Sequence, residues 1–238
     1  MRKDGRKFNE LRPVKITTGF VKFAEGSVLI ECGDTKVLCN ASVEDRVPPH
    51  VRPGNGWVTA EYSMLPRANR ERSRRDIDKL KLSSRSAEIQ RLIGRSLRAA
   101  VDMEALGERT ITIDCDVLQG DGGTRTASVT GGFIALALAC RKLVEEGYIG
   151  RNPIRHFAAG VSAGIVDDTA VLDLPYSEDS RAQVDLNCIM NELGEIIEIQ
   201  GTGEGRAFTV AEQQNLLELC AKGNRELIAK QREILGGL

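Results

Sequence analysis

The sequence predicts an α/β (α+β) protein made of two related halves packed into one body. Three observations favour this class. Each half shows strand patterns followed by a long helix, a short hairpin pattern recurs in both, and 238 residues suffice to bury a sizeable core. We therefore expect residues 1–238 to form a single compact domain, with an N-terminal half at 10–147 and a C-terminal half at 155–223.

The first 66 residues are dominated by strand patterns. Two apolar runs, Val28–Cys32 and Lys36–Asn40, flank Gly33-Asp34-Thr35, which is typical of a hairpin turn. Five Pro and Gly residues between positions 48 and 56 then indicate a loop.

A helix is expected from about Ser84 to Leu106, ended by Gly107. Its expected buried stripe consists of Ile89, Leu92, Ile93, Leu97 and Ala100. Its opposite face carries Arg91, Arg95 and Arg98. Ser84 is a plausible N-cap, which would place Arg85 in the first turn beside unpaired backbone N–H groups.

The most informative stretch is Gly120–Ser128, with the sequence GDGGTRTAS. It lies between an expected strand at Thr110–Leu118 and an apolar run at Val129–Val144 that predicts a buried helix. A glycine-rich turn before a helix leaves N–H groups free to bind an anion. Thr124 adds a hydroxyl and Arg125 adds a fork of donors that suits phosphate oxygens.

The glycine spacing matches neither the nucleotide-hydrolysing phosphate loop nor the Gly-x-Gly-x-x-Gly pattern of dinucleotide-binding proteins. The alternative is a flexible turn whose arginine pairs with a carboxylate. The loop alone does not decide between these two interpretations.

The C-terminal half begins after Asn152-Pro153 and again shows strand patterns followed by a helix. A second hairpin is expected around Asp167-Asp168, and two further strands are expected at Ala182–Met190 and Glu195–Gln200. The last helix opens with a capping box, Thr209 with Glu212, and runs to about Leu235.

Positive charge is concentrated in one segment, although the net charge of the chain is only −1. Between residues 67 and 98, eleven Lys or Arg accompany four Asp or Glu, so this segment carries +7. Its densest part contains Arg67, Arg70, Arg72, Arg74 and Arg75. The preference for arginine favours phosphate contacts with a polyanion such as RNA, and the alternative is a solvated loop that binds nothing.

Two carboxylates in the C-terminal half form a candidate metal pair. Alternating polarity places Asp185 on the polar face of a strand with one buried face. Asp179 would lie roughly 20 Å away in an extended chain, but the intervening residues resemble a turn that could bring it back. Two close carboxylates suit Mg²⁺ or Mn²⁺. Spacing alone favours two ordinary surface acids, and Asp114 with Asp116 is a rival pair.

Several classes of protein are excluded or disfavoured. The six cysteines form no Cys-x-x-Cys pair and the two histidines lie far apart, which disfavours zinc sites and histidine triads. The charged N-terminus is unlike a secretory signal, and no membrane-spanning segment is expected. We expect a cytoplasmic protein with reduced thiols and no membrane association.

Several long motifs, in order along nearly the whole chain, resemble the bacterial ribonuclease PH family, phosphorolytic exoribonucleases that trim tRNA 3′ ends. They are Asp4-Gly5-Arg6 with Glu10–Val14, Glu88–Arg95, Gly120–Ala127, and Asp173–Tyr176 with Glu178–Ser180 and Asp185–Asn187. The resemblance implies a repeated β/α unit and a homohexamer, built as a trimer of dimers.

The resemblance also implies roles for individual residues. Phosphate would be bound by Arg85, Gly123, Thr124 and Arg125, the last of which would also be catalytic. Asp179 and Asp185 would be catalytic and would bind the metal, Mg²⁺ or Mn²⁺. RNA would be bound by Arg67, Arg70, Arg72, Arg74 and Arg75.

The implied activity is that of a tRNA nucleotidyltransferase that works as a 3′-to-5′ exoribonuclease. Inorganic phosphate would be the co-substrate, nucleoside diphosphates would be released reversibly, and the substrates would be tRNA precursors and other structured RNA 3′ ends, including rRNA. Two alternatives are the active ring subunit of an archaeal-type exosome and a catalytically dead RNA-binding scaffold subunit. The presence of all five implied phosphate- and metal-site side chains argues against the second.

Overall fold

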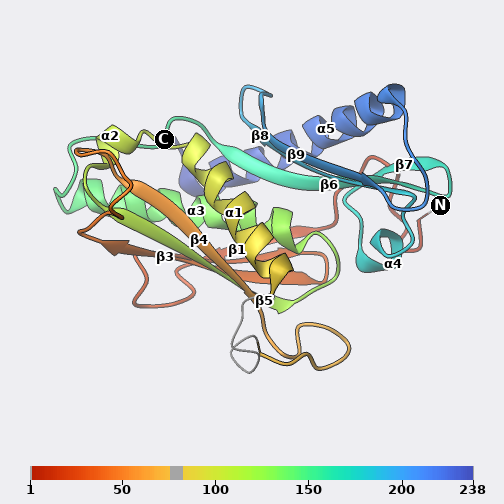
Figure 1. Ribbon diagram of the computed structural model, residues 1–238, viewed down its shortest axis with the longest axis horizontal. Coiled ribbons are helices and arrows are strands. Elements are labelled where there is room, and N and C mark those ends of the chain that lie inside the picture. Colours follow the sequence, from red (N-terminus) through yellow and green to blue (C-terminus); the bar gives the residue numbers. More distant parts are fainter. Residues whose placement is uncertain (1, 76–82, 238) are drawn as a thin grey trace.

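Two β-sheets and the helices packed on them make up the structure, a computed structural model that describes residues 2–75 and 83–237 (Figure 1). Part of the predicted basic segment, including Lys79 and Lys81, lies outside the described residues. The first sheet comes from the N-terminal half and the second from the C-terminal half. The predicted α/β class is therefore confirmed.

The first sheet has five strands in the order β1-β2-β3-β5-β4, and only β4 and β5 are parallel. The strands are β1 (Val14–Thr18), β2 (Gly26–Cys32), β3 (Thr35–Glu44), β4 (Trp57–Met64) and β5 (Thr110–Gln119). The predicted hairpin is confirmed, since β2 and β3 pair across a turn in which Gly33 has φ +56°. That left-handed backbone conformation favours glycine.

The second sheet is antiparallel, in the order β7-β6-β8-β9. Its strands are β6 (Ala158–Val166), β7 (Thr169–Leu172), β8 (Val184–Asn191) and β9 (Ile196–Gly203). The second predicted hairpin is also confirmed, with φ +48° at Asp167 and +56° at Asp168. Two consecutive positive φ angles are typical of a tight hairpin turn.

The helices are α1 (Ser84–Ala99), α2 (Met103–Leu106), α3 (Thr124–Glu145), α4 (Tyr176–Asp179) and α5 (Val210–Leu235). The prediction of one helix through Leu106 was wrong. The chain leaves the helix after Ala99, Val101 forms a bridge with Ile154, and Asp102 caps the separate α2. The N-cap of α1 is Ser83 rather than Ser84, so Arg85 still lies in the first turn. The predicted capping box of α5 is confirmed.

Helix α3 joins the two halves, because it packs against β2 and β3 of the first sheet and against β6 of the second (Figure 1). Its backbone approaches β2 closely, since a Cβ at Gly131 would lie 2.7 Å from Cγ2 of Ile30. By length and composition this helix could cross a membrane, contrary to the sequence expectation, but 78% of its most apolar window is buried inside the protein. Here it is a core helix.

Candidate active site

The glycine loop, residues 120–123, leads from β5 directly into α3. Gly122 and Gly123 have φ angles of +75° and +65°, so both require the left-handed conformation that glycine tolerates. Gly123 is the N-cap of α3 and provides no side-chain hydrogen bond to the first turn. No side chain caps the first turn of α3, which is compatible with the predicted anion site at this helix start.

The backbone carbonyl groups of the same loop accept hydrogen bonds from other parts of the protein. The Thr35 hydroxyl donates to the Gly122 carbonyl at 2.7 Å, and the Arg12 guanidinium donates to the Asp121 carbonyl at 2.6 Å. Gly122 also lies against the chain before α4, because a Cβ at this position would be 2.4 Å from the Leu174 carbonyl oxygen. The loop is therefore held in one position, with no room for a side chain at Gly122.

Thr124 and Arg125, the first two residues of α3, each have a partner from another element. The Thr124 hydroxyl lies 2.8 Å from the buried Tyr62 hydroxyl of β4. Burial raises the pKa of Tyr62, so this phenol stays protonated and keeps its hydrogen-bonding capacity. Arg125 donates to the Gln200 side chain on β9 at 2.9 Å and lies 3.7 Å from the Glu88 carboxylate on α1.

Asp179 and Asp185, the two predicted metal-binding acids, both feel the positive charge of Arg125. Asp179 is the last residue of α4, the turn that the sequence suggested, and Asp185 is the second residue of β8. Burial raises the pKa of Asp179 above its ordinary value, and the positive charges of Arg85 and Arg125 act in the opposite direction. Arg85 itself is exposed at the start of α1. The two arginines that were predicted to bind phosphate therefore act electrostatically on an acid that was predicted to bind a metal.

Asp185 is the more strongly perturbed acid. Burial, followed by the negative charge of Asp179, raises the pKa of Asp185 to about 6. Its Oδ2 accepts a hydrogen bond from the Asn187 amide at 3.3 Å, whereas its buried Oδ1 has no partner among the described residues. The expectation of a polar strand face was wrong here, because Asn187 is only 5% exposed and β8 is covered on both sides.

These residues fit a hard divalent cation. Two neighbouring carboxylates offer only oxygen ligands, and Oδ1 of Asp185 is a buried acceptor that receives no hydrogen bond from the part of the chain that the structure describes. Within the described residues no group of three or more acidic, histidine or cysteine side chains is arranged to hold a metal. The pair therefore suits Mg²⁺ or Mn²⁺, which keeps several waters and is completed by substrate phosphates.

The rival pair, Asp114 and Asp116, has a different environment. Both lie on β5, beside Glu61 of the neighbouring strand β4. Burial and the negative charge of Glu61 raise the pKa of each. Like charges therefore surround this pair, whereas the charges of Arg85 and Arg125 act on Asp179.

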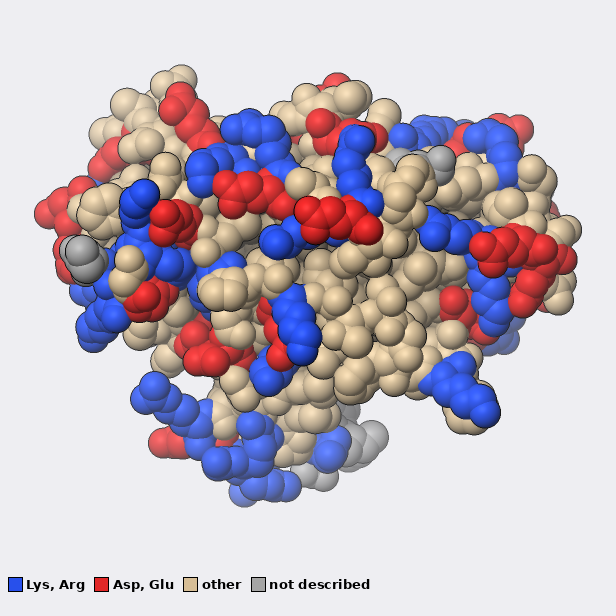
Figure 2. Space-filling model, turned by 180° about the vertical axis from the view of Figure 1, so that it is seen from behind, with Lys and Arg blue, Asp and Glu red and all other residues tan. Residues whose placement is uncertain are grey.

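The arginine-rich loop follows β4 and begins beside the glycine loop. The Gly120 N–H donates to the Ala68 carbonyl at 2.8 Å, which joins the two loops at their base. Its five arginines, Arg67, Arg70, Arg72, Arg74 and Arg75, are all exposed. Figure 2 shows blue side chains gathered on a lobe that projects from the body. The structure thus places positive charge next to the candidate phosphate site but does not fold it into that site.

Comparison with known proteins identifies relatives over nearly the whole chain. Residues 10–142 match domain 1 of the 3′ exoribonuclease family, and residues 156–223 match domain 2. Ribonuclease PH of Bacillus subtilis (strain 168) is 58% identical over 238 residues, covering 99% of this chain and 97% of that protein. Ribonuclease PH of Syntrophomonas wolfei is 56% identical over 236 residues, covering 99% of each chain.

Solved structures share the fold. The Archaeoglobus fulgidus exosome with RNA bound to the active site aligns with a TM-score of 0.81 at 25% identity, covering 96% of this chain and 92% of that one. Rrp46 of rice (Oryza sativa) aligns with a TM-score of 0.80 at 18% identity, covering 98% of this chain and 100% of that one. At 18% identity the likeness to Rrp46 concerns the fold alone.

Proposed function

Because this chain belongs to the ribonuclease PH family of 3′ exoribonucleases, we propose that it is a phosphorolytic 3′-to-5′ exoribonuclease and tRNA nucleotidyltransferase. Inorganic phosphate removes the 3′-terminal nucleotide of an RNA as a nucleoside diphosphate. One observation carries the proposal: the glycine loop lies against the chain that leads into α4, and the charges of Arg85 and Arg125 act on Asp179 while that of Arg125 acts on Asp185.

Phosphate is bound at the start of α3 in this proposal. Thr124 offers its hydroxyl, the loop N–H groups offer further donors, and Arg85 and Arg125 neutralise the charge of the nucleophile. Two anions must meet for the reaction to occur, so screening their charges and aligning the attack are the main tasks of the site. The clamped loop keeps the donors in place before substrate arrives.

In the reaction, a phosphate oxygen forms a bond to the phosphorus of the last phosphodiester. The bond from that phosphorus to the 3′ oxygen of the preceding nucleotide breaks, and a proton is transferred to that oxygen. The product is a nucleoside diphosphate and an RNA one nucleotide shorter. Because the diphosphate retains much of the energy of the cleaved bond, the reaction runs backward when diphosphates are abundant.

Asp179 and Asp185 would hold the Mg²⁺ or Mn²⁺ ion in this site. The ion would supply positive charge at the scissile phosphate and the leaving oxygen. Its positive charge would also offset the repulsion between the two carboxylates, which adds to burial in raising the pKa of Asp185.

The exposed arginine-rich loop is the proposed binding surface for tRNA and other structured RNA. Its charges would contact the RNA backbone outside the catalytic pocket, so binding should weaken as salt concentration rises. We further propose a cytoplasmic homohexamer, a trimer of dimers. The alternative of an exosome ring subunit requires a different partner subunit, and the identity of 56–58% to proteins named ribonuclease PH supports self-assembly. A single species of hexamer size on a sizing column tests this point.

The activity is tested by incubating the protein with a tRNA precursor in the presence and absence of inorganic phosphate. Phosphate-dependent shortening with release of nucleoside diphosphates is the expected result. Release of nucleoside monophosphates would mean hydrolysis, and it would contradict the proposed function.

A further inference from the structure

The N-terminal segment carries three arginines whose side chains point into the protein. The side chains of Arg2, Arg6 and Arg12 are only 2%, 9% and 5% exposed. Burying a guanidinium is costly unless its donors are matched by acceptors. All three lie against the segment from Leu172 to Glu178, which leads into Asp179. None of them has a part in the proposed phosphate chemistry.

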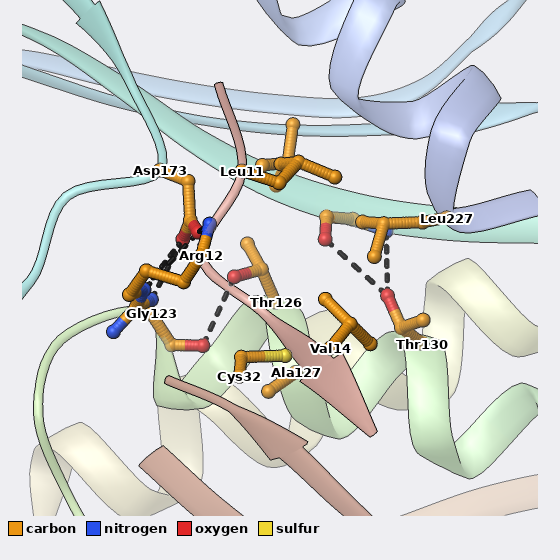
Figure 3. A pocket seen from close by; sticks show the side chains of 12 residues that line it. Leu11, Arg12, Val14, Cys32, Gly123, Thr126, Ala127, Thr130, Asp173 and Leu227 are labelled. Atoms are coloured by element: carbon orange, nitrogen blue, oxygen red, sulfur yellow. Dashed lines mark hydrogen bonds and ion pairs between the residues drawn. The ribbon is translucent and has the colours of Figure 1, made fainter. Parts of the chain in front are cut away.

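Arg12 and Asp173 form the centre of this arrangement (Figure 3). The Arg12 guanidinium donates to the Asp173 carboxylate from Nε at 3.1 Å and from Nη2 at 2.7 Å, and the Arg12 backbone N–H donates to it at 2.7 Å. Burial alone would raise the pKa of Asp173, but Arg12 and Arg6 hold it below its ordinary value. Both side chains of the Arg12–Asp173 pair are therefore charged.

The same guanidinium also contacts the glycine loop. Arg12 Nη1 donates to the Asp121 carbonyl at 2.6 Å, and Nη2 approaches the Gly122 carbonyl at 3.4 Å. All three nitrogen atoms of the guanidinium therefore have acceptors within the protein. Arg12 is thus bonded to the loop on one side and to the approach to α4 on the other, and its donors are already occupied by protein acceptors.

A second buried ion pair, between Arg2 and Glu178, lies at the C-terminal end of the segment from Leu172 to Glu178. Arg2 donates to the Glu178 carboxylate at 3.0 and 2.6 Å, to the Leu172 carbonyl at 2.7 Å and to the Asp173 carbonyl at 2.9 Å. Glu178 is 5% exposed and directly precedes Asp179. Asp173 has φ +52°, a left-handed conformation that costs energy for a residue with a Cβ. The surrounding bonds keep it in this conformation.

We propose that the buried pairs Arg12–Asp173 and Arg2–Glu178 form a positioning clamp that fixes the glycine loop relative to Asp179. The clamp sets the separation between bound phosphate and the carboxylate pair, and its members touch neither phosphate nor RNA. They are positioning residues. This role rests on the proposed function, because the geometry it fixes is that of the phosphorolytic site.

Asp173→Asn is the principal test. Asparagine keeps the size of the side chain and tolerates positive φ, but it removes the charge that Arg12 pairs with. Glu178→Gln is the second variant and removes the charge at the other end of the clamp. Lys222→Met is the matched control: it removes the bond from the Lys222 ammonium to the Asn9 carbonyl of the same N-terminal segment and its ion pair with Glu226 on α5, neither of which involves the loop or α4.

Each variant is assayed well below its melting temperature for kcat, for KM of inorganic phosphate and for RNA affinity. A clamp predicts that Asp173→Asn and Glu178→Gln lower kcat/KM for phosphate by about 10- to 100-fold, because small misplacements of reacting groups are costly. RNA affinity should stay within twofold, and Lys222→Met should match the wild type. Lower melting temperatures with unchanged kinetics would mean a purely structural role and would overturn the clamp.

Hydrogen exchange followed by mass spectrometry separates this inference from the proposed function. In the protein without substrate, Asp173→Asn should speed exchange in both peptides that the clamp joins, 117–128 and 172–182. It should also speed exchange at Arg12, whose backbone N–H donates to the Asp173 carboxylate, and leave the rest of the chain unchanged. If the wild-type protein released no nucleoside diphosphates, the proposed function would be wrong. Faster exchange in both peptides of the Asp173→Asn variant would still support the clamp. Exchange that is unchanged in either peptide would overturn it whatever the activity.

Discussion

Replacing Asp185 by asparagine should make the protein inactive but more stable. Burial and Asp179 raise the pKa of Asp185 from 3.8 to about 6. Between these values the folded protein keeps a proton that the unfolded chain has lost, so stability falls as the pH rises through this window. Since one pH unit corresponds to about 1.4 kcal/mol, the charged carboxylate costs about 3 kcal/mol at pH 7. The neutral amide of the Asp185→Asn variant carries no such cost.

The measurement is the melting temperature in EDTA at pH 4 and pH 7, together with phosphorolysis in Mg²⁺. At pH 7 the variant should melt about 6–12 °C higher than the wild type, and at pH 4 the difference should nearly vanish. Mg²⁺ should raise the melting temperature of the wild type only. Asp34→Asn, which changes an exposed acid in the β2–β3 turn, is the control and should leave both readings unchanged. A variant that melts lower at pH 7, or that still shortens RNA normally, would refute the reasoning.

Three further variants test the rest of the site. Arg125→Ala should lower phosphate-dependent shortening by about 10²–10³-fold while RNA binding persists, and normal trimming would contradict the loop assignment. Replacing Arg70, Arg72 and Arg74 by glutamine should weaken binding of tRNA more than that of short oligonucleotides and flatten its salt dependence, whereas equal losses would argue against a tRNA-binding loop. Gly122→Ala would place a Cβ 2.4 Å from the Leu174 carbonyl oxygen, on a residue with φ +75°. The loop must therefore shift, and KM for phosphate should rise in steady-state kinetics. An unchanged KM would show that the position of the loop is not critical.

The features that the sequence predicted correctly depend on neighbouring residues. The turns at Gly33 and at Asp167-Asp168 and the capping box at Thr209 each need a few residues in a row, so their patterns are visible in the chain. The same holds for the glycine loop, where strand, turn and apolar helix are consecutive. Local chemistry also explains the small error at α1, since Ser83 and Ser84 are both good N-caps and sequence alone does not rank them.

The features that the sequence did not predict depend on residues far apart in the chain. Tyr62, which meets Thr124, is 62 residues away from it, Gln200 is 75 residues from Arg125, and the Arg12 guanidinium reaches across 161 residues to Asp173. No local pattern marks such partners. Arg12 and Asp173 both stand in the motifs that carry the family resemblance, but the resemblance gave them no role.

The proposed site combines residues of both halves. The first half supplies the glycine loop and its arginines, and the second supplies Asp179 and Asp185. Their separation is set by direct contact, because Gly122 lies against the Leu174 backbone without room for a methyl group, and by the guanidinium of Arg12, which is bonded to both sides. Neither half therefore contains the proposed phosphorolytic geometry by itself. A change that moves one sheet against the other should impair phosphate binding more than RNA binding, because the proposed RNA-binding loop lies between β4 and α1 of the first half.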